Sequence, residues 1–288
     1  MRKELRVLET FSGIGAPRKA LMRGGYNFKI VDSIEIDPNP IKSYNAIYSD
    51  NIIPQDISQW NKTKQDIGEI DLLWNSSPCQ DFSLAGSNKS GNEGSGTRSS
   101  LVYEVIRIAK EFTPKYIVWE NVKGLTTKKH KHVLEDYIQK LDELGYNSSW
   151  KILKASDYGL PQNRERLFVV SILNDEKYIF PNTKQLIKSW KDFENKNYDE
   201  LLKAKPNKTP SREKMKEKCK NITNEKCCST ITTKQDRWPN AGIIDFEDYY
   251  RFLTPREQWL LMGFDNSDFE RAKEVNNKKS MLEKQARK

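Results

Sequence analysis

Cysteine is scarce in this sequence. Four are present among 288 residues, Cys79, Cys219, Cys227 and Cys228. Their spacing provides neither a disulfide framework nor a C-x-x-C pair for a structural zinc ion, and the vicinal pair makes a poor metal site. We therefore expect a reducing compartment and no bound metal.

Long apolar runs are also absent. No stretch approaches the roughly 18 apolar residues that a membrane-spanning helix requires. The N-terminal segment leads directly into a strand-like run, without the apolar core and cleavage site of a signal peptide. We therefore expect a soluble, cytoplasmic protein with no membrane partner. No internal repeat is visible.

Positive charge is in excess. The 49 Lys and Arg residues outnumber 40 Asp and Glu residues, which gives a net charge of +9 and an isoelectric point near 9.1. This balance favours a polyanionic partner, because binding to one releases condensed counterions. Basic proteins without such a partner also occur in lysine-rich proteomes. The length allows one large domain, or a large domain with a small one.

The first 175 residues alternate between strand-like and helix-like segments. Apolar runs predict strands at 5–9, 30–36, 70–74, 116–119, 150–154 and 166–173. Amphipathic segments predict helices from about residue 19 and over 101–112 and 133–144. This alternation is typical of an α/β fold with a doubly wound, parallel sheet.

The sequence changes character beyond about residue 175. It becomes rich in Lys, Asn and Glu and shows no clear period before residue 249. We interpret this part as a second, smaller domain. Thr254 as N-cap, Pro255 at the first helical position and Glu257 in a capping box predict the start of a helix there. Gly263 predicts its end.

The turn after the first predicted strand carries a glycine pattern. Phe11, Gly13 and Gly15 form a Phe-x-Gly-x-Gly sequence, which suits close approach of the backbone to a ligand. Such a turn can also be purely structural. Glu35, about 20 residues further on, can accept hydrogen bonds from both hydroxyls of a ribose. Asp56 can accept one from an adenine amino group, so the pattern favours an adenosine-containing cofactor.

The most informative segment is Ser77–Ser83, with the sequence Ser-Pro-Cys-Gln-Asp-Phe-Ser. It follows a predicted strand, and open α/β sheets bind ligands at the carboxyl ends of their strands. Cys79 is therefore a candidate nucleophile, although a single cysteine is often only a small buried apolar residue. The segment 86–100 has four glycines and no apolar residue. We predict that it is a mobile loop that closes over a substrate.

Three charged residues complete the candidate site. Glu120 follows an apolar strand and is expected at the same sheet edge as Cys79, where burial would raise its pKa and let it share a proton. An N-cap for the next helix is the alternative. Arg164 and Arg166 stand two residues apart and can hold a carbonyl or phosphate oxygen. An ordinary pattern of charges on an edge strand is the alternative for this pair.

These motifs together resemble those of the C5-cytosine DNA methyltransferases. The resemblance rests on the Phe-x-Gly-x-Gly turn, Glu35, Pro-Cys-Gln, Glu-Asn-Val, Gln-x-Arg-x-Arg and Arg-x-Leu-Thr-Pro-Arg-Glu, in the family's order. It covers 5–175 and 249–266 closely, whereas 176–248 matches only as a variable target-recognition region. It implies a Rossmann-like S-adenosylmethionine-dependent methyltransferase domain at 1–175, a target-recognition domain at 176–275 and a return segment at 276–288.

The resemblance implies a role for each matching residue. Cys79 would attack C6 of cytosine while Glu120 contacts N3 and the exocyclic amine, and carbon 5 would take the methyl group. Arg164 would hold O2 of the base, and Arg166 would lie near the thiolate. S-adenosyl-L-methionine would be the cofactor, held by Phe11, Gly13, Gly15, Glu35, Ile36, Asp56, Ile57, Pro78 and Leu101.

DNA binding is implied in the same way. The family flips its target base, because C6 is inaccessible in a stacked duplex. Double-stranded DNA is therefore the expected partner. The candidate DNA contacts are Ser83, Ser87, Thr232, Thr233, Lys234 and Arg237. Specificity depends on groove geometry, so these residues do not reveal the target sequence.

The end of the sequence departs from the family pattern. Leu282–Ala286 resembles the approach to a Gly-Asn-Ser motif and a final helix, but the sequence closes with Arg287 and Lys288. We therefore expect a truncated return segment, with a separate C-terminal polypeptide as one source of the missing piece, and otherwise a monomer. A catalytically impaired DNA-binding relic, a split-enzyme subunit and an RNA cytosine methyltransferase stay open as alternatives. A generic Rossmann dehydrogenase does not explain the candidate catalytic residues.

Overall fold

The computed structural model describes residues 4–78, 98–174, 176–232, 239–276 and 278–285. The chain forms two compact units. The first comprises Met1–Ile41, Asn51–Leu153 and Glu165–Pro181, and the second comprises Lys42–Asp50, Lys154–Arg164 and Asn182–Lys288. Each unit therefore combines segments that are far apart in the sequence.

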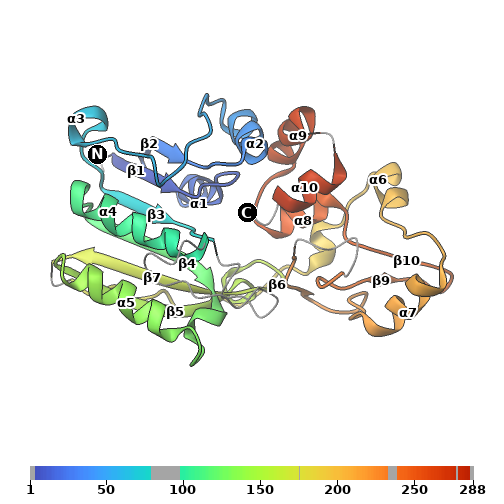
Figure 1. The fold of residues 1–288 in the computed structure, drawn as a ribbon. Helices are drawn as coiled ribbons and strands as arrows, with labels where there is room; N and C mark the ends of the chain where they lie inside the picture. Colours follow the sequence, from blue (N-terminus) through green and yellow to red (C-terminus); the bar gives the residue numbers. More distant parts are fainter. Residues whose placement is uncertain (1–3, 79–97, 175, 233–238, 277, 286–288) are drawn as a thin grey trace. The chain divides into compact units, whose positions relative to one another are not determined.

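A six-stranded sheet organises the first unit, in the order β2-β1-β3-β4-β7-β5 (Figure 1). β1 runs parallel to β2 and β3, and β3 runs parallel to β4. Leu8, Leu73 and Trp119 are buried in the core of this unit, as expected for strands covered on both faces. The strands are β1 (Leu5–Thr10), β2 (Phe28–Ile34), β3 (Leu72–Asn75), β4 (Tyr116–Val122), β5 (Tyr146–Lys154) and β7 (Glu165–Leu173).

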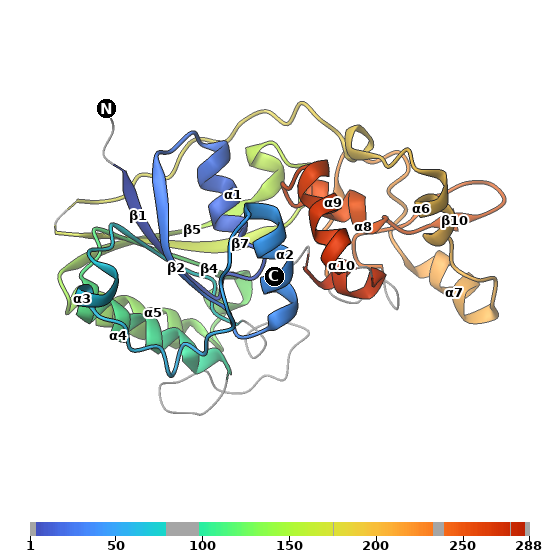
Figure 2. The ribbon, with the colours of Figure 1, turned by 90° about the horizontal axis from the view of Figure 1, so that it is seen from above.

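Helices cover both faces of this sheet. Figure 2 shows α1 (Ala16–Arg23) on one face, and α4 (Val102–Phe112) and α5 (Lys131–Asp142) on the other. α4 is strongly amphipathic, because its apolar side chains recur at helical spacing and are buried from Val102 to Phe112. The arrangement confirms the α/β, doubly wound class. The remaining helices of this unit are α3 (Lys64–Ile67), η1 (Arg98–Leu101), η2 (Lys123–Thr126) and the start of α2 (Pro38–Tyr48).

The sheet is not parallel throughout, which corrects one expectation. β7 pairs with β4 in the antiparallel direction, with Val122 opposite Arg166 and Tyr116 opposite Ile172. The connection from β5 to β7 consists of residues 155–164 and contains only a 3-10 turn (η3, Ala155–Tyr158) and the two-residue strand β6 (Gln162–Asn163). A parallel crossover needs about a dozen residues or more, usually with a helix. The chain therefore turns back along the sheet.

Strand ends also differ from the sequence-based prediction at a place that concerns function. β4 continues to Val122, so Glu120 and Asn121 belong to the strand rather than following it. β2 ends at Ile34, so Glu35 is the first residue beyond it. β5 begins at Tyr146, four residues before its predicted start. Tyr146 is buried, and its hydroxyl donates to Pro114 O at 2.8 Å.

The second unit consists of short elements. Two two-stranded sheets pair β6 with β8 (Cys228–Ser229) and β9 (Ile244–Asp245) with β10 (Tyr250–Arg251). Trp190, Ile222, Cys228, Ile244 and Leu261 are buried together in its main apolar cluster. The described helices of this unit are η3, η4 (Trp190–Phe193), α6 (Tyr198–Lys203), α7 (Pro210–Lys218), α8 (Pro255–Leu261), α9 (Asn266–Val275) and α10 (Lys279–Gln285), together with the end of α2.

The predicted start of α8 is confirmed. Thr254 is the N-cap, Pro255 occupies the first helical position, and Thr254 and Glu257 form a reciprocal capping box. Thr254 N donates to Glu257 Oε2 at 2.7 Å, and Glu257 N donates to Thr254 Oγ1 at 3.2 Å. Gly263 follows the helix with a φ of 95°, the left-handed conformation that glycine adopts without strain.

The last described helices pack within the second unit. Asn276 Nδ2 donates to Ser43 Oγ at 2.8 Å, and Ser43 Oγ donates to Gln285 Oε1 at 2.7 Å. Arg271 Nη1 donates to Ile47 O at 2.8 Å. The predicted return segment, 276–288, therefore contacts the second half of α2 through Asn276 and Gln285. Among the helices of the described residues, none is long and apolar enough to cross a membrane.

Candidate active site

The candidate site follows the carboxyl edge of the parallel strands in the first unit. The strand order places the loop after β2 beside the loop after β1, then the loop after β3, the end of β4 and the start of β7. Glu35, Gly13, Pro78, Glu120 and Arg166 follow this edge in that order. Open α/β sheets bind ligands at this edge. Glu35, the acidic candidate for binding a cofactor, therefore lies toward one end of this row. Glu120 and Arg166, the candidates for binding the base, lie toward the other end.

The turn between β1 and α1 is held in an unusual backbone conformation. Phe11, Gly13 and Gly15 have positive φ angles of 55°, 55° and 79°. Gly15 N donates to Ser12 O at 2.8 Å, and Gly15 O accepts from Lys19 N at 3.0 Å. Ser12 is 3% exposed, and its hydroxyl has no hydrogen-bond partner among the described residues. The turn therefore presents a buried polar group where a ligand could satisfy it.

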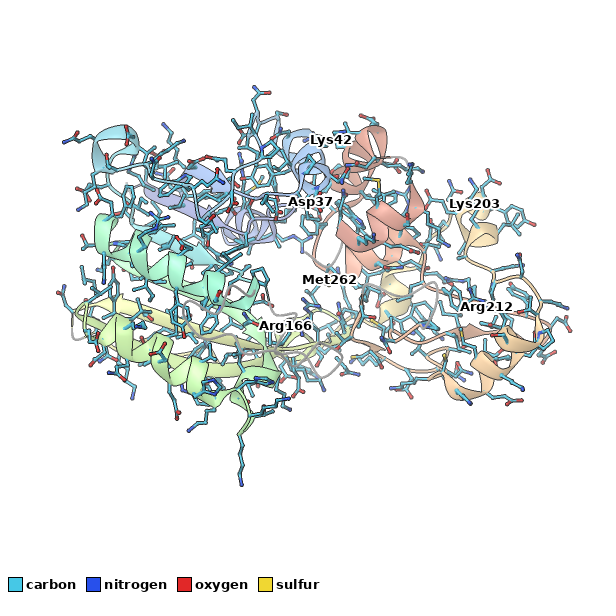
Figure 3. The ribbon with its side chains drawn as sticks, viewed as in Figure 1. Asp37, Lys42, Arg166, Lys203, Arg212 and Met262 are labelled. Carbon is cyan, nitrogen blue, oxygen red and sulfur yellow. The ribbon has the colours of Figure 1, made fainter. Side chains whose placement is uncertain are left out.

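Glu35 ties the end of β2 to this turn. Its side chain is buried, Oε2 accepts from Gly13 N at 3.1 Å, and Oε1 accepts from Asp37 N at 2.9 Å. Figure 3 labels Asp37 in the loop that leads into α2. The two backbone donors fix the orientation of the carboxylate. An acidic group thus stands directly beside the glycine turn, as the spacing of about 20 residues predicts.

The loop that carries Asp56 lies against the end of β2. Gln55 N donates to Glu35 O at 2.8 Å, and Asp56 Oδ1 accepts from Ser58 N at 3.0 Å and from Ser58 Oγ at 2.8 Å. Ile36 is 63% exposed, whereas Ile57 is 4% exposed and belongs to the apolar core. Ile36 therefore offers an apolar surface to a ligand, while the Ile57 side chain supports the loop from behind.

The segment that leads to the candidate nucleophile is anchored to β4. Trp119 Nε1 donates to Ser77 Oγ at 2.9 Å, and Asn121 Nδ2 donates to Ser77 O at 3.2 Å. Ser77 N donates to Asn75 Oδ1 at 2.9 Å, and all four side chains are buried. Pro78 is the last residue described before the gap. Cys79, Ser83 and Ser87 lie outside the described residues, as does most of the predicted loop at 86–100.

Glu120 and Arg166 form an ion pair across β4 and β7. Arg166 Nε lies 3.0 Å from Glu120 Oε1, and the two side chains are 20% and 24% exposed. Figure 3 labels Arg166 where β7 begins beside the end of β4. Val122 is the N-cap of η2 and makes no side-chain cap, so the alternative reading of Glu120 as an N-cap is wrong. Both side chains are therefore partly exposed at the sheet edge, where a ligand can reach them.

The other candidate residues fall elsewhere. Leu101 ends η1, precedes α4 and packs against the core of the first unit. Arg164 belongs to the second unit, where its carbonyl accepts from Ala155 N at 2.9 Å. Thr232 also lies in the second unit, and its Oγ1 accepts from Asn240 Nδ2 at 2.8 Å. Thr233, Lys234 and Arg237 lie outside the described residues.

Two acidic residues with little-exposed side chains were missed by the sequence analysis. Glu9, in β1, is fully buried, and its Oε1 accepts from Arg18 N at 3.0 Å in the first turn of α1. Asp32, in β2, accepts hydrogen bonds from Gln55, Trp60 and Lys62. The available signal was an acidic residue inside an apolar strand, which requires partners to be buried. The sequence gives no indication of which partners these are.

Comparison with known proteins identifies the relatives of this chain. The profile of the C-5 cytosine-specific DNA methylases matches residues 5–237. Type II methyltransferase M2.ScrFI of Lactococcus lactis subsp. cremoris is 32% identical over 326 aligned positions, covering 93% of this chain and 91% of the relative. Orphan methyltransferase M.Rho11sI of Bacillus phage rho11s is 38% identical over 174 positions, covering 60% of this chain but 34% of the phage protein.

A solved structure shares the fold. The Dnmt2 methyltransferase of S. pombe superposes with a TM-score of 0.82, covering 98% of this chain and 93% of the other. The sequence identity is 23%. The match therefore concerns the architecture, with its Rossmann-like sheet and smaller second part.

Proposed function

This chain belongs to the C-5 cytosine-specific DNA methylases and is a DNA (cytosine-5-)-methyltransferase, and we propose that the edge residues described above carry its reaction. The observation that carries this assignment is the Glu120–Arg166 pair, 3.0 Å apart, beside a β3 loop anchored to the same strand β4. The substrate is a cytosine in double-stranded DNA, flipped out of the stack so that its C6 becomes accessible.

The first end of the row fits S-adenosyl-L-methionine. Glu35 can accept from the ribose hydroxyls, Asp56 from the adenine amino group, and the exposed Ile36 can cover the adenine ring. The unsatisfied Ser12 hydroxyl and the glycine turn suit the polar amino acid part of the molecule. Pro78 and Leu101 complete the site in this proposal. When bound, the cofactor supplies a methyl group on a positively charged sulfur, which makes that carbon electrophilic.

The second end of the row activates the base. The Cys79 thiolate adds to C6, which makes C5 nucleophilic, and C5 then accepts the methyl group. The proton at C5 leaves to a base, and elimination of Cys79 restores the aromatic ring. A free thiol has a pKa of about 8.5, so a nearby cation such as Arg166 increases the thiolate fraction at neutral pH.

Glu120 stabilises the electron-rich base during this addition. Its carboxyl group can hydrogen-bond with N3 and the exocyclic amine, and a shared proton at N3 offsets the negative charge that the thiolate brings. The ion pair with Arg166 keeps the carboxylate in one orientation before the base arrives. Arg164 is assigned to O2 of the base. The remaining DNA contacts are assigned to Ser83, Ser87 and the 232–237 segment of the second unit, which we propose is the target-recognition domain.

Transfer of tritiated methyl from S-adenosylmethionine to unmethylated duplex DNA tests this proposal. The purified chain is expected to label 5-methylcytosine, and Cys79→Ser is expected to abolish the label while DNA binding persists. Glu120→Gln should lower the rate about 10²–10⁴-fold, the range typical of a lost proton-sharing group. Turnover by the Cys79 variant at the wild-type rate would eliminate it as the nucleophile.

A second readout follows the covalent step itself. In a duplex with 5-fluorocytosine, C5 carries no proton to release, so methylated adduct should accumulate on the enzyme and survive denaturing electrophoresis. Cys79→Ser should form none. DNA binding with neither label nor adduct in the unaltered chain would support the relic or split-enzyme reading instead.

A further inference from the structure

Asp32 occupies a distinctive position on the edge strand of the sheet. It lies in β2, one of the two outermost strands, three residues before Glu35. The register between β1 and β2 shifts there, because Val7 pairs with Ile30 but Leu8 pairs with Asp32. Such a bulge re-aims the side chains that follow it. The Asp32 side chain is 9% exposed, which is unusual for a carboxylate.

Three residues of one loop donate hydrogen bonds to this carboxylate. Gln55 Nε2 donates to Oδ1 at 2.9 Å, while Trp60 Nε1 and Lys62 Nζ donate to Oδ2 at 2.9 Å and 2.8 Å. A fourth bond comes from Ser33 N, at 2.8 Å to Oδ1. Burial would raise the pKa of Asp32, but the donors, Lys62 and Trp60 foremost, lower it below its usual range. Asp32 is therefore held as a carboxylate.

The same loop covers the open edge of β2. Gln55 Nε2 also donates to Ser33 O at 3.1 Å, and Gln55 N donates to Glu35 O at 2.8 Å. These bonds satisfy carbonyl groups that an edge strand would otherwise leave exposed. They also join the loop to the residue that we assign to the ribose.

The far side of the loop is fixed to α4. Arg107 Nη2 donates to Ile57 O at 3.0 Å and to Trp60 O at 2.7 Å. The side chains of Ile57 and Trp60 are 4% and 5% exposed and belong to the apolar core. Asp56 thus lies on a short stretch that is clamped by Asp32 and Glu35 on one side and by Arg107 on the other.

We propose that Asp32 is a positioning residue for the cofactor site. By binding Gln55, Trp60 and Lys62, it fixes the loop of Asp56 relative to Glu35, so that ribose and adenine acceptors are held at one separation before the cofactor binds. A preorganised site avoids paying the cost of ordering the loop on binding. The inference rests on the proposed function, because it assumes that Glu35 and Asp56 contact the cofactor.

The Asp32→Asn variant tests this role. It keeps the side-chain size but replaces one acceptor oxygen with an amide that faces donors of the loop. Binding of S-adenosylhomocysteine, measured by titration calorimetry without DNA, should weaken at least tenfold. In methylation assays, KM for S-adenosylmethionine should rise by a similar factor. The kcat at saturating cofactor and the KM for DNA should stay within about twofold.

Asp66→Asn is the matched control. Asp66 lies four residues beyond Lys62 and allows the same aspartate-to-asparagine substitution. Its carboxylate caps α3, where Oδ2 accepts from Thr63 N at 2.7 Å. This control should bind S-adenosylhomocysteine with unchanged affinity. Gln55→Met provides a second variant with a milder change, since it removes the amide that donates to Asp32 Oδ1 and Ser33 O and leaves the backbone bond to Glu35. It should weaken binding about threefold.

The outcomes separate the inference from the proposed function. Glu35→Gln and Asp56→Asn should each weaken binding of S-adenosylhomocysteine, and if neither does, the assignment of the cofactor site is wrong. If they do, but Asp32→Asn binds within twofold of the unaltered chain, the positioning role is wrong. A lower unfolding midpoint in the Asp32 variant, with unchanged affinity, would show that Asp32 only stabilises the fold.

Discussion

Glu257→Gln should destabilise the second unit more than any surface substitution. Glu257 is 1% exposed and forms a bidentate pair with Arg251, whose side chain is 3% exposed. Arg251 Nη1 and Nη2 donate to its two oxygens at 2.9 Å and 3.0 Å. Asn195 N and Thr254 N donate to the same carboxylate at 3.0 Å and 2.7 Å. One buried side chain thus connects β10, α8 and the segment after η4.

The magnitude follows from these contacts. Glutamine carries one acceptor oxygen, so its amide nitrogen must face a donor of Arg251 together with the backbone N–H of either Asn195 or Thr254. The guanidinium then keeps one carboxylate partner, Glu194, at 3.0 Å, and that side chain is 32% exposed. Removing one member of a buried ion pair typically costs about 3–5 kcal/mol. Because the Arg251 charge keeps the partly exposed Glu194 carboxylate as a partner, we expect a loss toward the lower end of this range. This is a large part of the roughly 5–15 kcal/mol that stabilises a typical domain.

Urea unfolding followed by tryptophan fluorescence measures the loss, since Trp190 and Trp259 of this unit are buried. Hydrogen exchange should place the faster exchange in residues 251–264. The double variant Arg251→Met, Glu257→Gln removes both charges and should lose less stability than Glu257→Gln alone, because no guanidinium is left short of a partner and the glutamine oxygen can still accept from a backbone N–H. A loss below about 1 kcal/mol for the single variant would refute the reasoning.

Two further predictions concern pH dependence and the nucleophile loop. Burial opposes ionisation of Glu200, but hydrogen bonds from Arg256 and Lys273 lower its pKa to about 2. The stabilising effect of the Glu200 carboxylate should therefore be present at neutral pH and be lost as the pH falls from about 4.5 toward 2. In Glu200→Gln, the melting temperature should no longer depend on pH through this group over that window. The variant should lose about 1–2 kcal/mol of stability at pH 7, a value reduced for solvent screening. Ser77→Ala leaves the buried indole N–H of Trp119 without its acceptor, which should cost about 1–3 kcal/mol of stability. The variant should also lower kcat without changing KM for DNA. An unchanged kcat would show that this hydrogen bond does not position the loop after β3.

The sequence predicted the part of the fold that depends on local pattern. Apolar runs located the strands of the first unit, and the capping box of Thr254 and Glu257 located the start of α8, because both signals lie within a few residues. Gly13, Glu35 and Glu120 lie at the carboxyl edge of the parallel strands, the edge at which the sequence analysis predicted the candidate site.

The remaining features depend on contacts between distant residues. The Asp32 partners lie 23–30 residues away, and their side chains are brought together only by a bulge and a loop. Apart from α8, the elements of the second unit were not predicted, because its other helices carry little apolar periodicity; α7 buries only Met215 among its nine residues. Tertiary packing rather than helical periodicity determines these elements.

The reversed direction of β7 explains why Glu120 and Arg166 meet. β7 is nine residues long, which corresponds to about 30 Å. In a parallel strand, the first residues would lie at the amino edge of the sheet, and Arg166 would stand that far from the carboxyl end of β4. The antiparallel direction instead places Arg166 opposite Val122, two residues from Glu120. An ion pair that the motif spacing alone cannot place is therefore a direct consequence of the short connection between β5 and β7.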